Sequence, residues 1–340
     1  MNVYLLASAS INPVTELPDT TLPAAIACGE GNRRIAREPD YKKYILDANI
    51  RRRMSRVMKM GVAAAMQCLS QSGRQPGAII TATGLGCLND TEKFLKNIIE
   101  NGEHLLNPTP FTQSTFNTIG AQAAIVLKNT NYNTTYVHRG FSFENALLDA
   151  MMKIRDGEAA QVLVESYEEQ TDTSFKIMER LGFWRHGAVC GEGVQCFILS
   201  AQPGAAGKVR LKDVLCVFGG EPQTLKEKLS LFLRKNGLHP GEVDVLLSGK
   251  SGRDSRCPYY QMAEEVFHTA SVAVYKPFFG DYPTVSSLAL WLAARVITQQ
   301  QLPGWLSDAP PQQINRMVIY NHFNGKNHSF LLVEKEEVEG

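Results

Sequence analysis

Three hydroxyl or thiol side chains and two histidines are the residues of this 340-residue chain that could build a covalent catalytic site. Ser142, Ser248 and Cys257 lie near expected turns, and His138 or His322 could act as the base. Such a nucleophile takes up an acyl group when a nearby imidazole removes its proton. The sequence therefore leaves an acyltransferase or a hydrolase open, although no local spacing pairs a nucleophile with a base.

Other motifs that suggest a bound cofactor lack the necessary spacing. Gly84-Leu-Gly is not a dinucleotide fingerprint, and Gly249-Lys-Ser-Gly does not have the spacing of a phosphate-binding P-loop. The seven cysteines include no CxxC pair, and no histidine/cysteine cluster has the spacing of zinc ligands. We therefore expect no metal and no nucleotide cofactor.

Composition and charge exclude further classes of protein. The 35 basic and 34 acidic residues give a net charge of +1, so no overall field recruits nucleic acid or an anionic membrane. The longest apolar stretch, Val285 to Ile297, contains serines and an arginine and is too short to span a bilayer. An odd number of cysteines without disulfide spacing, and no basic leader before Pro13, favour the cytoplasm. We expect a cytoplasmic protein without nucleic-acid or membrane partners.

Helical and strand patterns alternate along the chain, which predicts an α/β fold with mostly parallel strands covered by helices. In the first part, helices are expected at 54–72, 91–100, 118–128 and 145–155, and strands at the N-terminus and at 77–82, 134–138, 157–165 and 193–200. In the second part, strands are expected at 209–218, 243–247, 317–322 and 329–334, and helices at 223–236, 258–268 and 284–300. The turn-rich segment at 201–207 predicts a boundary, with halves at residues 1–204 and 205–340.

The order of these elements, together with several motifs, resembles the β-ketoacyl synthases of fatty-acid and polyketide biosynthesis. The resemblance covers nearly the whole chain. In the first half the matching motifs are Arg51-Arg-Arg-Met-Ser-Arg before an alanine-rich helix, Gly84-Leu-Gly, Ile154-Arg-Asp-Gly-Glu-Ala, Glu165-Ser-Tyr-Glu-Glu and Gly191-Glu-Gly. In the second half they are Gly237-Leu-His-Pro-Gly-Glu-Val-Asp, Lys276 with Gly280, and Asn321-His-Phe.

This resemblance implies a thiolase-like fold, in which two similar halves stack as five layers (αβαβα) and the chain forms a dimer. It also implies a site in which a cysteine at a helix N-terminus accepts an acyl group. Two histidines then support decarboxylation of malonyl-acyl carrier protein and stabilise the carbanion or oxyanion. The helix dipole favours the thiolate, and the histidines donate where negative charge develops.

The matching positions of this chain lack all three of these side chains. The family's spacing back from Gly157 places Gly140 at the position of the cysteine. Ser248 or Gly249 stands at the first histidine, and Asp281 stands at the second, five residues after the retained Lys276. An ionised aspartate cannot donate a hydrogen bond to an enolate. We therefore expect no catalytic residue for condensation, and a chain that is inactive alone.

Within the family, the chain most resembles the type of subunit called a chain-length factor. Such a subunit pairs with an active ketosynthase and shapes the shared acyl tunnel. Such subunits commonly carry glutamine at the cysteine position, whereas this chain has Gly140. The implied partners are an active ketosynthase in a heterodimer, or a second copy in a homodimer, and an acyl carrier protein. Phosphopantetheine is expected only as the carrier brings it, and the product suggested is of the aryl-polyene type.

Two groups of residues are candidates for binding under this reading. Candidates for the acyl pocket are Phe111, Phe116, His138, Phe141, Ser142, Phe143, Phe278, Phe279, His322 and Phe323. Candidates for docking the acidic carrier are Arg51, Arg52, Arg53, Arg56 and Lys59. The alternatives are a condensing or acyl-transferring enzyme that uses substituted residues, and a homodimeric scaffold that binds carrier protein without turnover.

Overall fold

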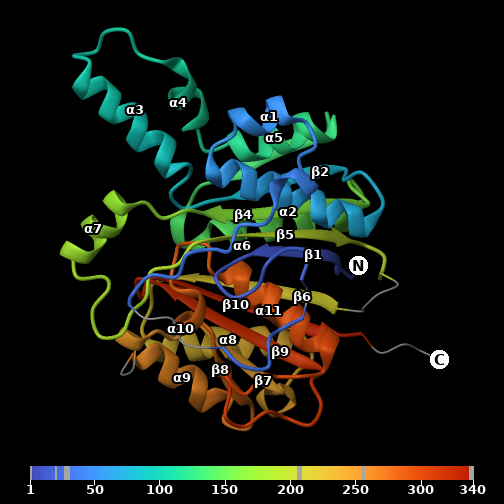
Figure 1. The fold of residues 1–340 in the computed structure, drawn as a ribbon. Helices are drawn as coiled ribbons and strands as arrows, with labels where there is room; N and C mark the ends of the chain where they lie inside the picture. Colours follow the sequence, from blue (N-terminus) through green and yellow to red (C-terminus); the bar gives the residue numbers. More distant parts are fainter. Residues whose placement is uncertain (1, 20, 27–30, 205–208, 255–256, 337–340) are drawn as a thin grey trace.

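A computed structural model describes residues 2–19, 21–26, 31–204, 209–254 and 257–336 (Figure 1). The first half contains five strands in the order β3-β2-β4-β5-β1. They are β1 (Tyr4–Ile11), β2 (Ala78–Ala82), β3 (Tyr132–Tyr136), β4 (Gln161–Glu168) and β5 (Gly193–Ser200). Its helices are α1 (Ala48–Arg53), α2 (Arg56–Ser72), α3 (Leu88–Glu100), α4 (Pro108–Gln113), α5 (Thr118–Leu127), α6 (Ser142–Arg155) and α7 (Asp172–Arg180).

The second half repeats the same strand order, β8-β7-β9-β10-β6 when read from its outer edge. Its strands are β6 (Val209–Phe218), β7 (Val245–Ser248), β8 (Ser271–Val274), β9 (Arg316–Phe323) and β10 (Asn327–Lys335). Its helices are α8 (Pro222–Lys235), α9 (Pro258–Val266), α10 (Lys276–Phe279) and α11 (Ser286–Gln299). Short 3-10 turns lie at Tyr41–Lys43, Arg139–Phe141, Pro240–Glu242 and Gly252–Asp254. The two halves are therefore copies of one topology.

The strands of both halves belong to one ten-stranded sheet, which is joined where β1 meets β6. The register of this antiparallel junction rests on one residue pair, Tyr4 with Arg210. Three apolar cores separate the layers. One lies between the two halves around α6 and α11, one lies under α2 and α5, and one lies under α8 and α9. The predicted αβαβα stacking is confirmed.

Helix α11 shows why the sequence builds a central layer. A helix that packs on one sheet needs one apolar face. A helix packed between the two five-stranded halves of the sheet must bury its whole circumference. The segment SSLALWLAARVITQ does so, because its apolar residues are buried along the whole length of the helix. Its polar residues bond within the core: Ser287 Oγ donates to Gln195 Oε1 at 2.8 Å, and Arg295 Nη2 donates to Ser8 O at 3.0 Å.

Most elements lie where the sequence places them. Strand β6 and the start of α9 coincide with the expected bounds, whereas α3 and α6 each begin three residues earlier than expected and β3 lies two residues earlier. Helix α7 is not predicted from the sequence. It begins with a capping box, in which the side chains of Thr171 and Ser174 each accept from the backbone N–H of the other. The predicted boundary of the halves at 204/205 adjoins residues 205–208, which lie outside the described residues, and stays a prediction.

Candidate functional site

The family's cysteine position, Gly140, lies at the turn between β3 and α6, at the N-terminal end of that helix. Arg139 before it has a left-handed φ of 50°, which is uncommon for a residue with a Cβ. A Cβ added to Gly140 would lie 2.5 Å from Cβ and 2.8 Å from Cγ of Phe323. Both distances are below van der Waals contact, so Phe323 fills the place that a nucleophilic side chain would need.

The position of the first histidine is filled in a similar way. Ser248 ends β7 with its side chain fully buried, and a Cβ at Gly249 would lie 2.4 Å from Asn321 Oδ1 and 3.0 Å from Tyr275 Oη. The backbone is fixed there as well, since Gly249 N donates to Tyr320 O at 2.8 Å and Tyr260 Oη donates to Gly249 O at 2.7 Å. Polar and aromatic side chains of the second half therefore occupy the space for an imidazole.

The position of the second histidine carries an ion pair. Lys276 Nζ lies 2.9 Å from Asp281 Oδ1, and the lysine side chain is only 2% exposed. Breaking such a buried pair leaves an uncompensated charge, so the two residues hold each other in place. The carboxylate oxygen paired with Lys276 accepts a hydrogen bond and cannot supply one to a developing enolate.

A cavity of ≈ 190 Å³ lies beside Asp281 and the contact between Gly140 and Phe323. Arg139, Asp281 and Phe323 line one side of it, and α7 with the segment after it supplies Phe175, Phe183 and Trp184. Phe175 and Trp184 stack with their ring centroids 6.2 Å apart. These aromatic residues are not predicted from the sequence, because its apolar pattern indicates no helix at α7.

Two carboxylates, Glu168 and Glu169, also line the cavity. Burial raises the pKa of Glu168 to about 8 and that of Glu169 to about 7. The backbone N–H groups of Gly84 and Leu85 and the hydroxyl of Thr284 donate to Glu168 and oppose this rise. Both carboxyls therefore keep their protons to a higher pH than an ordinary glutamate does.

The predicted acyl-pocket residues fall into different environments, and among them Phe323 lines this cavity. Phe143 packs on Phe197 in the central core, while Phe278 and Phe279 pack on Trp305. Phe111, Phe116 and His138 are exposed at the surface, and Phe141 is buried and stacks on His138. The role of each as an acyl contact stays a prediction.

The basic docking candidates also differ from one another. Arg56 forms ion pairs with Glu38 at 2.6 Å and with Glu192 at 2.7 Å, so it joins α2 to the body of the first half. Arg51 Nη1 donates to Ile45 O, and Arg52 Nη2 donates to Asn49 Oδ1. Arg52 and Arg53 are exposed, and Lys59 is half-buried. Of the five, Arg52 and Arg53 present the most accessible charge.

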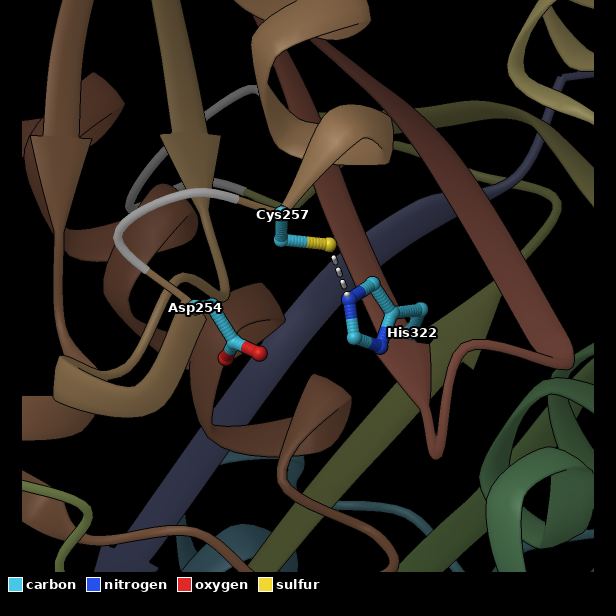
Figure 2. Close-up of side chains that lie close together, drawn as sticks. All are labelled: Asp254, Cys257 and His322. Atoms are coloured by element: carbon cyan, nitrogen blue, oxygen red, sulfur yellow. Dashed lines mark hydrogen bonds between the residues drawn. The ribbon is translucent and has the colours of Figure 1, made fainter. Parts of the chain in front are cut away.

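Of the nucleophile–base pairs considered from sequence, the structure brings together Cys257 and His322. Cys257 Sγ lies 3.3 Å from His322 Nε2, and Figure 2 shows the two side chains pointing at each other. Ser142 is fully buried and bonds the backbone instead of a base. Its hydroxyl accepts from His138 N at 2.7 Å and donates to Thr83 O at 2.8 Å. Ser142 thus stabilises the start of α6.

His322 is a neutral imidazole at neutral pH. Burial lowers its pKa to about 4, and the positive charge of Lys276 acts in the same direction. Its Nδ1 accepts a hydrogen bond from Gly325 N at 3.3 Å, so the ring proton is on Nε2, which donates to the sulfur of Cys257. Asp254 completes the cluster, with its ligand atom and those of Cys257 and His322 all within 4.8 Å of one another.

The last three residues of β9 contact Gly140, Gly249 and Cys257. Phe323 contacts Gly140, Asn321 lies against Gly249, and His322 bonds Cys257. Three successive residues of β9 thus reach Gly140 in the first half and Gly249 and Cys257 in the second. Gly140 and Gly249 therefore lie beside neighbouring residues of one strand, and the role of these positions in a shared site stays a prediction.

Residues 30–195 match the family model described as the beta-ketoacyl synthase N-terminal domain. No curated protein sequence matches the chain. Among the described residues, no helix combines the length and the apolar character needed to cross a membrane.

Solved structures share the fold across nearly the whole chain. A chain of the structure described as the ishigamide ketosynthase/chain length factor is 14% identical with a TM-score of 0.78, over 99% of both chains. A chain of the complex of a ketosynthase with its chain length factor from Xenorhabdus doucetiae is 14% identical with a TM-score of 0.74, over 98% of both. A beta-ketoacyl synthase from Burkholderia phymatum is 12% identical with a TM-score of 0.70, over 99% of this chain and 100% of that one. Residues 30–195 are thus similar to the N-terminal domain of the β-ketoacyl synthases, and the chain as a whole shares the fold of these solved structures.

Proposed function

We propose that this protein is a non-condensing subunit of the chain-length-factor type, which pairs with an active β-ketoacyl synthase and works on acyl carrier protein in fatty-acid or polyketide biosynthesis. The observation that carries the proposal is the position of Phe323, which fills the space of a side chain at Gly140. A chain without a nucleophile at this position, and without room for one there, cannot accept the acyl group on which condensation depends.

The other two positions support the same conclusion. Condensation needs donors aimed at the oxygen where negative charge develops. Gly249 is enclosed by Asn321 and Tyr275, and Asp281 is paired with Lys276. Neither position supplies an imidazole, so the partner must bring the complete catalytic set.

The role left to this chain is to bind and shape. The cavity between α7 and Phe323 offers aromatic walls suited to an apolar chain. Phosphopantetheine enters only on the carrier protein. Arg52 and Arg53 are the candidate contacts for that carrier protein. Similar structures include a ketosynthase with its chain length factor and a type II acyl-carrier protein in complex with its ketosynthase. An aryl-polyene-type product and a cytoplasmic location remain part of the proposal.

Intact-mass spectrometry tests this function. The chain, a cysteine-bearing ketosynthase co-expressed with it, and both together are incubated with acyl- and malonyl-carrier protein. We expect condensed product only with both subunits, and the acyl adduct only on the cysteine of the partner. Replacing that cysteine by alanine should abolish product, whereas Cys257→Ala in this chain should leave product formation intact.

An acyl adduct or decarboxylation with this chain alone would overturn the proposal in favour of an enzyme with substituted residues. Binding of carrier protein by a homodimer, with no complex and no product when the ketosynthase is present, would instead support the scaffold. Each outcome is read in the same set of incubations.

A further inference from the structure

We propose that Asp254, Cys257 and His322 form a binding site for a divalent cation of the zinc class, independent of the role proposed above. The three side chains come from the 3-10 turn at Gly252–Asp254, the residue before α9, and β9 (Figure 2). Sequence spacing did not predict a metal here, since His322 lies 65 positions from Cys257.

The geometry favours a shared ion over a catalytic triad. In a triad, the nucleophile and the carboxylate contact opposite nitrogens of the imidazole, so these two groups lie far apart. Here the thiol, the carboxylate and a ring nitrogen all lie within 4.8 Å of one another. Ligands around tetrahedral zinc, at about 2.0–2.3 Å from the metal, are separated by about 3.3–3.8 Å. Small side-chain movements would therefore bring all three donors onto one ion.

The donor set and its surroundings fit this class of metal. Sulfur, imidazole and carboxylate together suit zinc better than magnesium or calcium, which take oxygen ligands. Asp254 Oδ2 accepts from Ser251 N at 3.1 Å and from Ser251 Oγ at 2.6 Å, which orients the carboxylate. Cys257 precedes the N-terminus of α9, whose dipole interacts favourably with a thiolate. Asp254 and His322 are buried, so water competes little with the protein ligands.

Binding requires two proton movements. The thiol of Cys257 releases its proton to solvent as the sulfur–metal bond forms, and the ring proton of His322 moves from Nε2 to Nδ1. The Gly325 N–H, which now faces Nδ1 at 3.3 Å, must then turn away. The turn between β9 and β10 is therefore expected to change its amide resonances when metal binds.

Cobalt(II) titration of the full chain, after treatment with a chelator, tests the site. Wild-type protein should bind one equivalent with a thiolate-to-cobalt charge-transfer absorption, and zinc should displace the cobalt. Cys257→Ser should remove the thiolate absorption, and Asp254→Asn and His322→Gln should each weaken cobalt binding at least tenfold. Cys216→Ser, a partly buried cysteine on β6 outside the cluster, is the matched control and should bind like the wild type.

The thermal unfolding midpoint gives a second reading on the same samples. Zinc should raise the midpoint of the wild type and of Cys216→Ser, because a ligand that binds only the folded state stabilises it. Asp254→Asn keeps the shape of the side chain, so it still tests the site if Cys257→Ser does not fold. The proposal is overturned if saturating cobalt gives no thiolate absorption in the wild type, or if the absorption persists in Cys257→Ser.

Discussion

At the scale of residues, side chains from the second half stand where the condensing groups would be. Motif spacing identified Gly140, Ser248 or Gly249, and Asp281 as altered positions, because identity and order can be read from a sequence. It could not show that Phe323 and Asn321 fill the vacated space, since these contacts join residues far apart in the chain. Likewise, sequence offered Cys257 and His322 as one pair among several, and it did not include Asp254.

Restoring the nucleophile tests the fit of Phe323. Gly140→Cys should destabilise the protein by about 1–3 kcal/mol, because the new side chain overlaps Phe323. In the Phe323→Ala background, where the space is open, adding Gly140→Cys should cost less stability than it does in the wild type. Urea denaturation of the wild type, the two single variants and the double variant measures these differences. A Gly140→Cys protein as stable as the wild type would contradict the assigned overlap. We expect no condensation from the double variant, because Asp281 still replaces the second histidine.

The buried carboxyl of Glu165 gives the protein a pH dependence. Burial raises the pKa of Glu165 to about 8 from the ordinary 4.5, and neither of its oxygens has a hydrogen-bond partner among the described residues. Between these values the folded state keeps a proton that the unfolded chain releases, so stability falls as pH rises. Glu168 and Glu169 contribute in the same direction.

Glu165→Gln should therefore flatten the fall in unfolding free energy between about pH 5 and about pH 8, and should stabilise the protein by a few kcal/mol at the upper end. Denaturant titrations at both pH values measure this change. Glu100→Gln, on the exposed face of α3, is the control that should keep the slope of the wild type. An unchanged slope in Glu165→Gln would show that the carboxyl ionises freely in the folded protein.

At the scale of elements, apolar periodicity predicted most helices and strands, because each must bury a face against a neighbour. It failed where an element buries little. Helix α7 places Phe175 in the core and leaves most of its other residues at the surface, and β8 spans only four residues. Such segments are fixed by caps and by contacts with distant residues, which a local pattern does not contain.

Strand β3 lies at one end of the sheet, where one of its edges has no neighbour among the strands that the structure describes. An open edge is a template for a strand of another chain. Val137, directly after β3, is 41% exposed. Val137→Glu should reduce co-purification with the ketosynthase at least tenfold while leaving the circular-dichroism spectrum unchanged. Leu231→Glu, an equally apolar exposed site on α8, should pull down the partner normally. Loss with both variants, or with neither, would refute β3 as the contact.

At the scale of the whole molecule, the repeated strand order explains how two halves with different sequences share one site. The alternation of elements was enough to predict an α/β protein, and the family resemblance supplied the five layers. The single residue pair that joins β1 to β6 could not be predicted, because turn and strand patterns do not specify which edges meet. The close approach of β9 to the turn before α6 follows from that joining.

Helix α11 sets the order in which the chain can be finished during translation. The five strands of the first half are complete at Ser200, whereas α11, which packs against β1 and β5 as well as β9 and β10, begins only at Ser286. Until that helix leaves the ribosome, α6 covers part of the inner face of the first five strands, where Phe143 packs on Phe197, and the part that α11 covers next to β1 and β5 stays open. The growing chain therefore presents an apolar surface to chaperones for the time needed to synthesise most of the second half.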